Sequence, residues 1–319
     1  MKRPHGGRQT ISTHILITQP QVKSCVDALK QQFTVHNLAT ATDPEALLRE
    51  VGPEIRGIAG GKVSAALLEK LPKLEIIAVS GVGYDSVDAA AVKARNIRLT
   101  NTPGVLTDAV AELTIGMMIA LSRRIPQGDR FIRDGKWLDG AFGNWSELKG
   151  KTLGILGLGR IGKEIANLAI ALKMHVVYHG RAEQKGAPYP YFESVVAMAR
   201  ASDWLVVIAP GNASTTGIIS REVLEALGPK GVLVNMARGN MVDQDALVDM
   251  LVSKQLGGAA LDVFDKEPAV PEALLDLDNV VLSPHQGSRT EETRAAVGDM
   301  VVANLTAHFS GKPLISPVF

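Results

Sequence analysis

The stretch that decides the fold reads Lys-Thr-Leu-Gly-Ile-Leu-Gly-Leu-Gly-Arg-Ile-Gly-Lys and runs from Lys151 to Lys163. Thr152 to Leu156 is an apolar run typical of a buried strand, and apolar residues recur at helical spacing after the run. Between strand and helix lie Gly157, Gly159 and Gly162, spaced as G-x-G-x-x-G. A strand, a glycine turn and a helix in this order predict a site for a dinucleotide.

Each glycine has its own predicted task. Gly157 makes the tight turn, Gly159 lets the pyrophosphate approach the backbone, and Gly162 lets the helix pack closely on the strand. The phosphates then lie at the helix N-terminus, where unpaired N–H groups and the helix dipole favour an anion. The alternative is an ordinary glycine-rich loop, but the flanking strand and helix favour the cofactor site.

The next predicted strand, Met174 to Tyr178, narrows the choice of cofactor. A site selective for NAD carries an acid about 20 residues past the glycines, which accepts hydrogen bonds from the ribose. Here the strand is followed by His179, Gly180 and Arg181, with no acid. The guanidinium of Arg181 is suited to a 2′-phosphate, so the sequence predicts NADP(H) as the preferred cofactor, with NAD(H) possible. The alternative for Arg181 is a solvated surface charge.

Composition excludes several classes of partner. The chain has 319 residues, enough for two domains, and 46% of them are hydrophobic, enough for a real core. The net charge of +1 and the 4% aromatic content favour neither nucleic acid nor a membrane surface. The single cysteine, Cys25, excludes an internal disulfide and is expected to be buried. Residues 1–10 show no secretory signal and are expected to be a frayed tail, so the protein is expected to be cytoplasmic.

Strand and helix candidates alternate along the chain, which indicates parallel, doubly wound sheets. The predicted strands are 14–18, 33–38, 55–59, 74–79 and 97–100, then six in the second part at 152–156, 174–178, 204–209, 231–236, 258–263 and 280–282. The predicted helices are 21–32, one opening at Asp43-Pro44, one from Ser64 to about Leu71, a long one starting at Thr107 that breaks or kinks at Pro126, then 193–200, 222–227, 243–254 and 291–309. The last helix is expected to return to the first domain.

A glycine-rich loop follows the strand that ends near Val79. It reads Ser-Gly-Val-Gly-Tyr-Asp-Ser-Val-Asp, from Ser80 to Asp88. In parallel sheets ligands bind at the carboxyl ends of the strands. The backbone amides around Val82 and Gly83 are therefore candidates to hold a small carboxylate, with a plain turn as the alternative.

Three polar residues follow strands of the second part. Arg238 comes after the strand 231–236, Glu267 after 258–263, and His285 after 280–282. Reduction of a 2-keto acid needs a cation for the carboxylate and carbonyl oxygen, a proton donor for the alkoxide, and a group that orients the donor. Arginine, histidine and glutamate supply these three functions. Taken singly, the arginine could be a solvated charge and the glutamate could close a turn.

Together these segments resemble the D-isomer-specific 2-hydroxyacid dehydrogenases, and within that family the glyoxylate/hydroxypyruvate reductases. The similar segments, which span about residues 80 to 290, are Gly81–Asp88, Asn101–Gly104 with Ala111-Glu112, Gly157–Gly162, Asn235–Gly239 with Val242-Asp243, Leu261–Phe264 with Glu267-Pro268, and Pro284-His285.

The resemblance implies two doubly wound parallel-sheet domains, with a Rossmann cofactor domain (residues 105–284) inserted in a flavodoxin-like substrate domain (1–104 and 285–319). It implies Arg238, Glu267 and His285 as catalytic residues, and Val82, Gly83, Arg238 and His285 as substrate-binding residues. Besides the glycines and Arg181, it places cofactor contacts at Thr107, Arg160, Ile161, Ala237, Asp262 and Gly287. It implies no metal, a homodimer built around residues 107–145, and an active site in the cleft between domains.

The expected activity is NADPH-dependent reduction of short 2-keto acids, glyoxylate or hydroxypyruvate, to D-2-hydroxy acids, with His285 as proton donor. Glu267 rather than glutamine argues against the formate dehydrogenase branch. Two alternatives stay open: a reductase for bulkier aryl or sugar-derived 2-keto acids, and a non-catalytic dinucleotide sensor. The sequence leaves open whether Trp137 or Trp145 reaches an active site.

Overall fold

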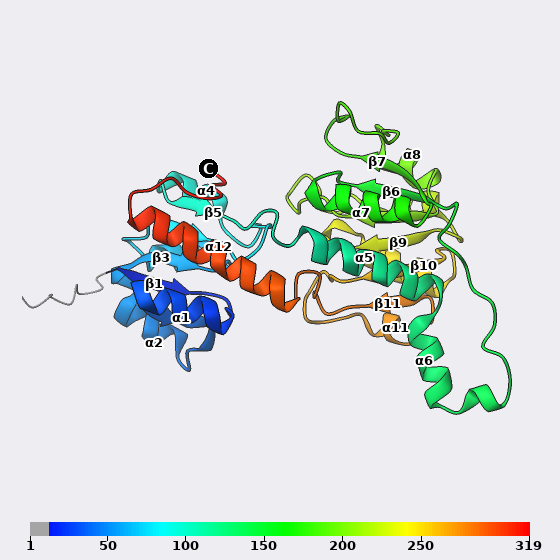
Figure 1. Ribbon diagram of the computed structural model, residues 1–319, viewed down its shortest axis with the longest axis horizontal. Coiled ribbons are helices and arrows are strands. Elements are labelled where there is room, and N and C mark those ends of the chain that lie inside the picture. Colours follow the sequence, from blue (N-terminus) through cyan, green and yellow to red (C-terminus); the bar gives the residue numbers. More distant parts are fainter. Residues whose placement is uncertain (1–12) are drawn as a thin grey trace, which may run out of the picture. The chain divides into compact units, whose positions relative to one another are not determined.

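The computed structural model describes residues 13–319 and divides into two compact units. Unit 1 ends at Leu106, resumes at Thr290 and runs to Phe319, whereas unit 2 is continuous from Thr107 to Arg289. The tail predicted at residues 1–10 lies outside the described residues. Each unit is an α/β structure on a parallel sheet, which confirms the predicted fold class (Figure 1).

The sheet of unit 1 has five parallel strands in the order β2-β1-β3-β4-β5. This 2-1-3-4-5 order is the flavodoxin-like one. The strands are β1 (His14–Ile17), β2 (Thr34–Asn37), β3 (Ile55–Ala59), β4 (Ile76–Ala78) and β5 (Arg98–Thr100). Their apolar runs are covered on both faces, as parallel strands require.

One face of this sheet is covered by α1 (Lys23–Gln32) and α12 (Glu291–Phe309), which lie side by side (Figure 1). Their cluster with the sheet includes Ile15, Cys25 and Val301, all at most 1% exposed. The C-terminal helix thus returns to the first strands, as predicted. Burial raises the pKa of the Cys25 thiol to about 11, so this cysteine is an unreactive core residue.

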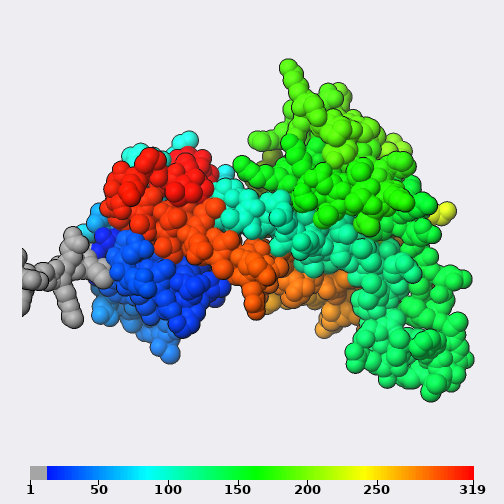
Figure 2. Space-filling model, viewed as in Figure 1, coloured from blue at the N-terminus to red at the C-terminus, as the bar shows by residue number. Residues whose placement is uncertain are grey.

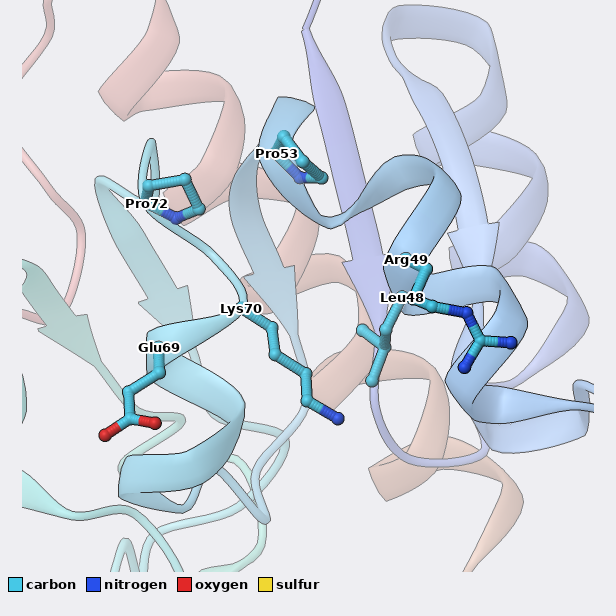
Figure 3. A pocket seen from close by; sticks show the side chains of 6 residues that line it. All are labelled: Leu48, Arg49, Pro53, Glu69, Lys70 and Pro72. Carbon is cyan, nitrogen blue, oxygen red and sulfur yellow. The ribbon is translucent and has the colours of Figure 1, made fainter.

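The other face packs against α2 (Pro44–Val51), α3 (Ala65–Glu69) and α4 (Ala89–Ala94). Their N-termini are set by side-chain caps: Asp43, Ser64 and Asp88 each accept a hydrogen bond from the backbone N–H three residues on. A shallow hollow between α2 and α3 is lined by Leu48, Arg49, Pro53, Glu69, Lys70 and Pro72 (Figure 3). It lies by the amino ends of β3 and β4, away from the edge where such sheets bind ligands.

The sheet of unit 2 has six parallel strands in the order β11-β10-β9-β8-β6-β7, the number that the sequence predicts. They are β6 (Thr152–Leu156), β7 (His175–His179), β8 (Trp204–Val207), β9 (Val232–Asn235), β10 (Gly258–Leu261) and β11 (Val280–Leu282). A parallel bridge from Tyr191 to Tyr178 adds one more residue pair beyond β7. We number the strands of unit 2 from β6 as strand 1 and count the Tyr191 segment, which follows β7, as strand 3. From that edge the strand order is then 3-2-1-4-5-6, followed by β11. The order 3-2-1-4-5-6 is the Rossmann arrangement.

Helices cover this sheet on both faces (Figure 1). They are α5 (Thr107–Ser122), α7 (Arg160–Ala171), α8 (Val195–Arg200), α9 (Arg221–Leu227), α10 (Gln244–Val252) and α11 (Glu272–Leu275). The helix α6 (Ile125–Arg133) follows α5 and leads away from the sheet. The apolar helix α5 packs along α7, and Ala166 and Ala169 of α7 are fully buried. No helix within residues 13–319 is both long enough and apolar enough to span a bilayer.

Three α-helices were not predicted from the sequence, namely α4, α6 and α11. At Pro126 the sequence predicts a break or kink of the long helix, but Pro126 lies in the first turn of the separate helix α6. The long helix has already ended at Ser122, and Arg124 takes a left-handed conformation (φ +53°) between the two helices. Proline fits a first helical turn because the N–H it lacks has no partner there.

Candidate active site

The glycine turn after β6 is shaped by close approach of the backbone. Gly157 has φ +104°, and a Cβ there would lie 2.7 Å from Cα of Ala209, just after β8. A Cβ on Gly162 would lie 2.2 Å from the carbonyl oxygen of Gly157. Both positions therefore demand glycine. At Gly159, by contrast, no described atom lies within 4 Å of the Cβ position, so the backbone is open to a ligand.

The turn also presents the N-terminus of α7. Gly159 is the N-cap, and with no side chain it makes no cap hydrogen bond to the amides of the first turn, which begins at Arg160 and Ile161. Unpaired amides at the positive end of a twelve-residue helix form a site for an anion. The open backbone at Gly159 and these amides fit the pyrophosphate of a dinucleotide.

The loop after β7 is tied to the glycine turn. The side chain of Gln184 donates from Nε2 to the carbonyl of Leu158 (2.8 Å), and its backbone N–H donates to the hydroxyl of Tyr178 (2.7 Å). These bonds hold the exposed Arg181 in a short loop beside the turn. The strand β7 itself ends at His179, not at an acid.

The end of β9 positions Arg238 through buried Asn235. The Asn235 amide accepts from the N–H of Ala237 (3.1 Å) and donates to the carbonyl of Arg238 (2.9 Å). The guanidinium of Arg238 donates to the carbonyl of Ala237 (2.7 Å), and Gly211 lies against its side chain. The buried amide thus fixes the backbone on both sides of the arginine.

Gly239 lets two strand-end loops meet. A Cβ at this position would lie 1.9 Å from the carbonyl carbon of Phe264, so only glycine fits. The loop that carries Arg238 therefore lies directly against the loop that carries Glu267.

Glu267 and His285 form a pair. The Oε2 atom of Glu267 lies 2.7 Å from Nδ1 of His285, and Oε1 accepts from the N–H of Phe264 (3.2 Å). Because both carboxylate oxygens are engaged, the glutamate has one defined orientation. The side chains are 47% exposed for His285 and 36% for Glu267, so a small molecule can reach the imidazole. A hydrogen-bonded imidazole with its Nε2 edge accessible can carry a proton to or from a ligand.

Asp262 shapes the turn that carries His285. Its carboxylate is 2% exposed and accepts three hydrogen bonds, from the hydroxyl of Ser283 (2.6 Å) and from the N–H groups of Gln286 (2.8 Å) and Gly287 (2.9 Å). The backbone carbonyl of Asp262 accepts from the N–H of His285 (2.8 Å). These bonds hold His285 at φ +50°, a conformation that non-glycine residues rarely adopt.

The other residues singled out in the sequence fall into both units. In unit 2, Thr107 begins α5, Ala237 is buried beside Arg238, and Gly287 packs against Asp262. In unit 1, Val82 and Gly83 are exposed, and the carbonyl of Val82 accepts from the side chain of Asn101 (2.8 Å). Because the peptide is planar and trans, this bond also fixes the direction of the Gly83 N–H.

The supporting roles of three residues, Asn235, Gly239 and Ser283, were not predicted from the sequence. Asn235 and Ser283 are polar residues at the ends of apolar strands, a signal that could have marked them. Within residues 13–319, no three His, Cys, Asp or Glu side chains gather as metal ligands.

The fold and the site define a class, the nicotinamide dinucleotide-dependent oxidoreductases built on a Rossmann sheet. Residues 115–287 match the family model described as D-isomer specific 2-hydroxyacid dehydrogenase, NAD binding domain. The chain is 44% identical over 310 residues to a glyoxylate/hydroxypyruvate reductase A of Arabidopsis thaliana, covering 96% of this chain and 99% of the relative. It is 45% identical over 307 residues to a hydroxyphenylpyruvate reductase of Plectranthus scutellarioides, covering 95% and 98%.

Among solved structures, the NADPH-dependent glyoxylate/hydroxypyruvate reductase of Sinorhizobium meliloti in complex with NADP and malonate superposes with a TM-score of 0.90. It is 41% identical, with 96% of this chain and 97% of that chain covered. The chain belongs to the D-isomer-specific 2-hydroxyacid dehydrogenase family, in its glyoxylate/hydroxypyruvate reductase branch. It is an NAD(P)-dependent enzyme that reduces 2-keto acids, which sets aside the non-catalytic sensor.

Proposed function

We propose that the enzyme reduces short 2-keto acids, glyoxylate or hydroxypyruvate, to D-2-hydroxy acids with NADPH. The observation that carries this proposal is the pair of His285 and Glu267, in which the carboxylate occupies Nδ1 at 2.7 Å and leaves Nε2 as the working atom. Reduction of a ketone forms an alkoxide, and an imidazolium is a proton donor matched to that task near neutral pH.

Each residue then has one task in the reaction. Nε2 of His285 gives its proton to the oxygen formed from the carbonyl. Glu267 accepts from Nδ1 and so holds the imidazole in one orientation. Arg238 binds the carboxylate and polarises the carbonyl oxygen, which stabilises charge as it develops. The amides of Val82 and Gly83 bind the substrate carboxylate.

When bound, the cofactor would supply the hydride that adds to C2 of the keto acid. The residues proposed to hold it are the glycines 157, 159 and 162 with Arg160 and Ile161 at the pyrophosphate, and Thr107, Ala237, Asp262 and Gly287 elsewhere. For Asp262 we propose a contact through the turn that its carboxylate organises, because both carboxylate oxygens are already hydrogen-bonded.

Arg181 is the proposed basis of a preference for NADPH. The end of β7 carries no acid to accept from the ribose hydroxyls, and the exposed guanidinium follows two residues later. A guanidinium binds phosphate through paired hydrogen bonds. The Sinorhizobium meliloti neighbour, which is described as NADPH-dependent, is consistent with this preference.

A substrate panel tests the proposal. Oxidation of NADPH and of NADH is followed with glyoxylate, hydroxypyruvate, phenylpyruvate and a sugar-derived 2-keto acid. The proposal expects the highest kcat/KM with glyoxylate or hydroxypyruvate and with NADPH. Higher values with NADH would reject the cofactor proposal, whereas higher values with a bulky acid would reject the substrate proposal alone.

A second candidate is a reductase for aryl 2-keto acids. The 45% identity to a hydroxyphenylpyruvate reductase favours it. Both candidates use the same histidine, glutamate and arginine, so the difference lies in the pocket around the substrate side chain. The ratio of kcat/KM for hydroxyphenylpyruvate to that for hydroxypyruvate separates them.

We propose that a second copy of the chain covers the apolar side chains between residues 125 and 145. This segment forms a lobe at the margin of unit 2 (Figure 2). Its exposed apolar residues are Ile125 (52%), Ile132 (58%), Trp137 (67%), Leu138 (93%) and Trp145 (45%). A concentration of this kind marks an interaction site. Light scattering should give a dimer for the wild type and for Leu275→Asp, an exposed control, and a monomer for Leu138→Asp with Ile132→Asp.

A further inference from the structure

The residue at the end of β7, His179, is held in one orientation. Its Nδ1 lies 2.8 Å from the carbonyl oxygen of Phe192, and its ring stacks on Tyr191 with 10° between the planes and 6.2 Å between the centroids. A carbonyl can only accept a hydrogen bond, so Nδ1 must carry a proton. The remaining ring nitrogen, Nε2, is therefore a bare acceptor in the neutral imidazole and a donor only in the imidazolium.

The segment that holds His179 is itself fixed to β7. Tyr178 exchanges backbone hydrogen bonds with Pro190 (3.0 Å) and Phe192 (2.9 Å), and the hydroxyl of Tyr191 donates to the carbonyl of Gly180 (3.3 Å). The segment around Tyr191 lies on the side of β7 that faces away from β6, and it orients the imidazole from that side. Its orientation does not depend on the ligand.

His179 also lies next to the glycine turn. Its backbone carbonyl accepts from the N–H of Gly157 (2.9 Å), and it pairs in register with Leu156 at the end of β6. It is the strand-end residue where an NAD-selective site carries its acid. Tyr191 stacks on its ring, and Tyr178 precedes it in β7. The charged residues of the following loop are Arg181, Glu183 and Lys185, and Arg160 begins α7. Among residues 13–319, no acidic side chain pairs with the ring of His179.

We propose that His179 is a specificity-determining residue of the cofactor site, whose imidazolium binds the 2′-phosphate of NADP(H) through Nε2 beside Arg181. This inference rests on the proposed preference for NADPH and adds a second residue to it. A phosphate at Nε2 requires the protonated ring, because the proton on Nδ1 is already given to Phe192. A dianionic phosphate has no proton of its own to give to Nε2, whereas arginine donates to it directly.

The test measures binding of adenosine 2′,5′-bisphosphate and of 5′-AMP by calorimetry. The variant is His179→Asn, whose amide can keep the bond to Phe192 while Nε2 is removed. The matched control is His175→Asn, the exposed first residue of the same strand. Loss of one charge-assisted hydrogen bond should weaken the bisphosphate about 10- to 100-fold and change 5′-AMP by less than about twofold.

Equal weakening of both ligands, or an unchanged bisphosphate affinity, would overturn the role of His179. If the asparagine variant does not fold, His179→Ala is measured with the same two ligands, and equal affinity changes for both ligands would overturn the proposal. The proposed cofactor preference fails separately: the wild type would then bind the bisphosphate no tighter than 5′-AMP.

Discussion

The carboxyl edges of the two sheets are built differently. In unit 2, buried polar side chains brace the strand ends. Asn235, the last residue of β9, is 1% exposed and hydrogen-bonds to the loop that follows it. Asp262, just after β10, is 2% exposed and accepts hydrogen bonds from the loop that carries His285. In unit 1, residues 82–86 are all exposed, and the side chain of Asn101 donates a hydrogen bond to the carbonyl of Val82 in that loop. The braced edge carries the residues proposed for chemistry, whereas the exposed edge carries those proposed for binding.

This difference fits the demands of the two tasks. Proton transfer requires donor and acceptor within hydrogen-bond reach, so small displacements are costly. Binding of a carboxylate by backbone amides is weakened less when the donors are displaced by a small distance. Variants at the braced edge should therefore change kcat, and variants at the exposed edge should change KM.

The largest effect is expected for His285→Gln. Glutamine has about the reach of the histidine but no titratable proton, so kcat should fall by about 10²- to 10⁴-fold. NADPH affinity, measured by fluorescence titration, should stay within about twofold of the wild type. A kcat near that of the wild type would remove His285 from the chemistry.

The next effect is expected for Asp262→Asn. An amide nitrogen cannot accept from the N–H of Gln286 or Gly287, so at least one buried donor loses its partner and the free energy of unfolding should fall by about 1–3 kcal/mol. The His285 turn loses its anchor, and kcat should fall about 10- to 100-fold. The control is Asp265→Asn, an exposed aspartate in the following loop. Stability and kcat equal to those of the control would show that the Asp262 carboxylate neither stabilises the strand ends nor positions His285.

Much of the braced edge could be read from the sequence. Apolar runs predicted all six strands of unit 2, and the glycine spacing located the turn, because both depend on residues that are neighbours in the chain. The caps at Asp43 and Ser64 were readable for the same reason. Arg238, Glu267 and His285 were singled out because each follows a strand whose carboxyl end faces one edge.

The supporting bonds could not be read in this way. The bond from Ser283 to Asp262 joins residues 21 positions apart, and the contact of Gly239 with Phe264 depends on how two loops pack. Pro126 was ambiguous because proline both ends and begins helices, and only the left-handed Arg124 before it separates the two cases. These features depend on contacts and backbone conformations that local sequence patterns do not predict.

A smaller effect is expected at the exposed edge. Asn101→Ala removes the bond to the carbonyl of Val82, worth about 1 kcal/mol net, so the KM for the keto acid should rise about fivefold. The kcat should stay within about twofold, and Asn167→Ala on the surface of α7 should change neither value. A fall in kcat without a change in KM would contradict the division between the two edges.

The smallest effect is expected at the opposite end of unit 1, where His36 lies 3.2 Å from His14. Burial and the neighbouring His14 hold the pKa of His36 below its ordinary value of 6.5, against a weaker opposing effect of Glu50. The unfolded chain therefore binds the proton more readily, and stability falls as the pH drops below 6.5. His36→Gln should lose less stability than the wild type over that range in urea titrations. His175→Gln should behave like the wild type, and equal slopes for all three would contradict the assignment.

The central claim is that His285 and Glu267 act as one acid–base unit, and a double-mutant cycle on kcat tests it most directly. His285→Gln, Glu267→Gln and the double variant are compared with the wild type under saturating NADPH and keto acid. If the glutamate acts only through the imidazole, the double variant should be no slower than His285→Gln alone, within about twofold. Losses that multiply to the product of the two single effects would contradict the account, because the two residues would then act independently.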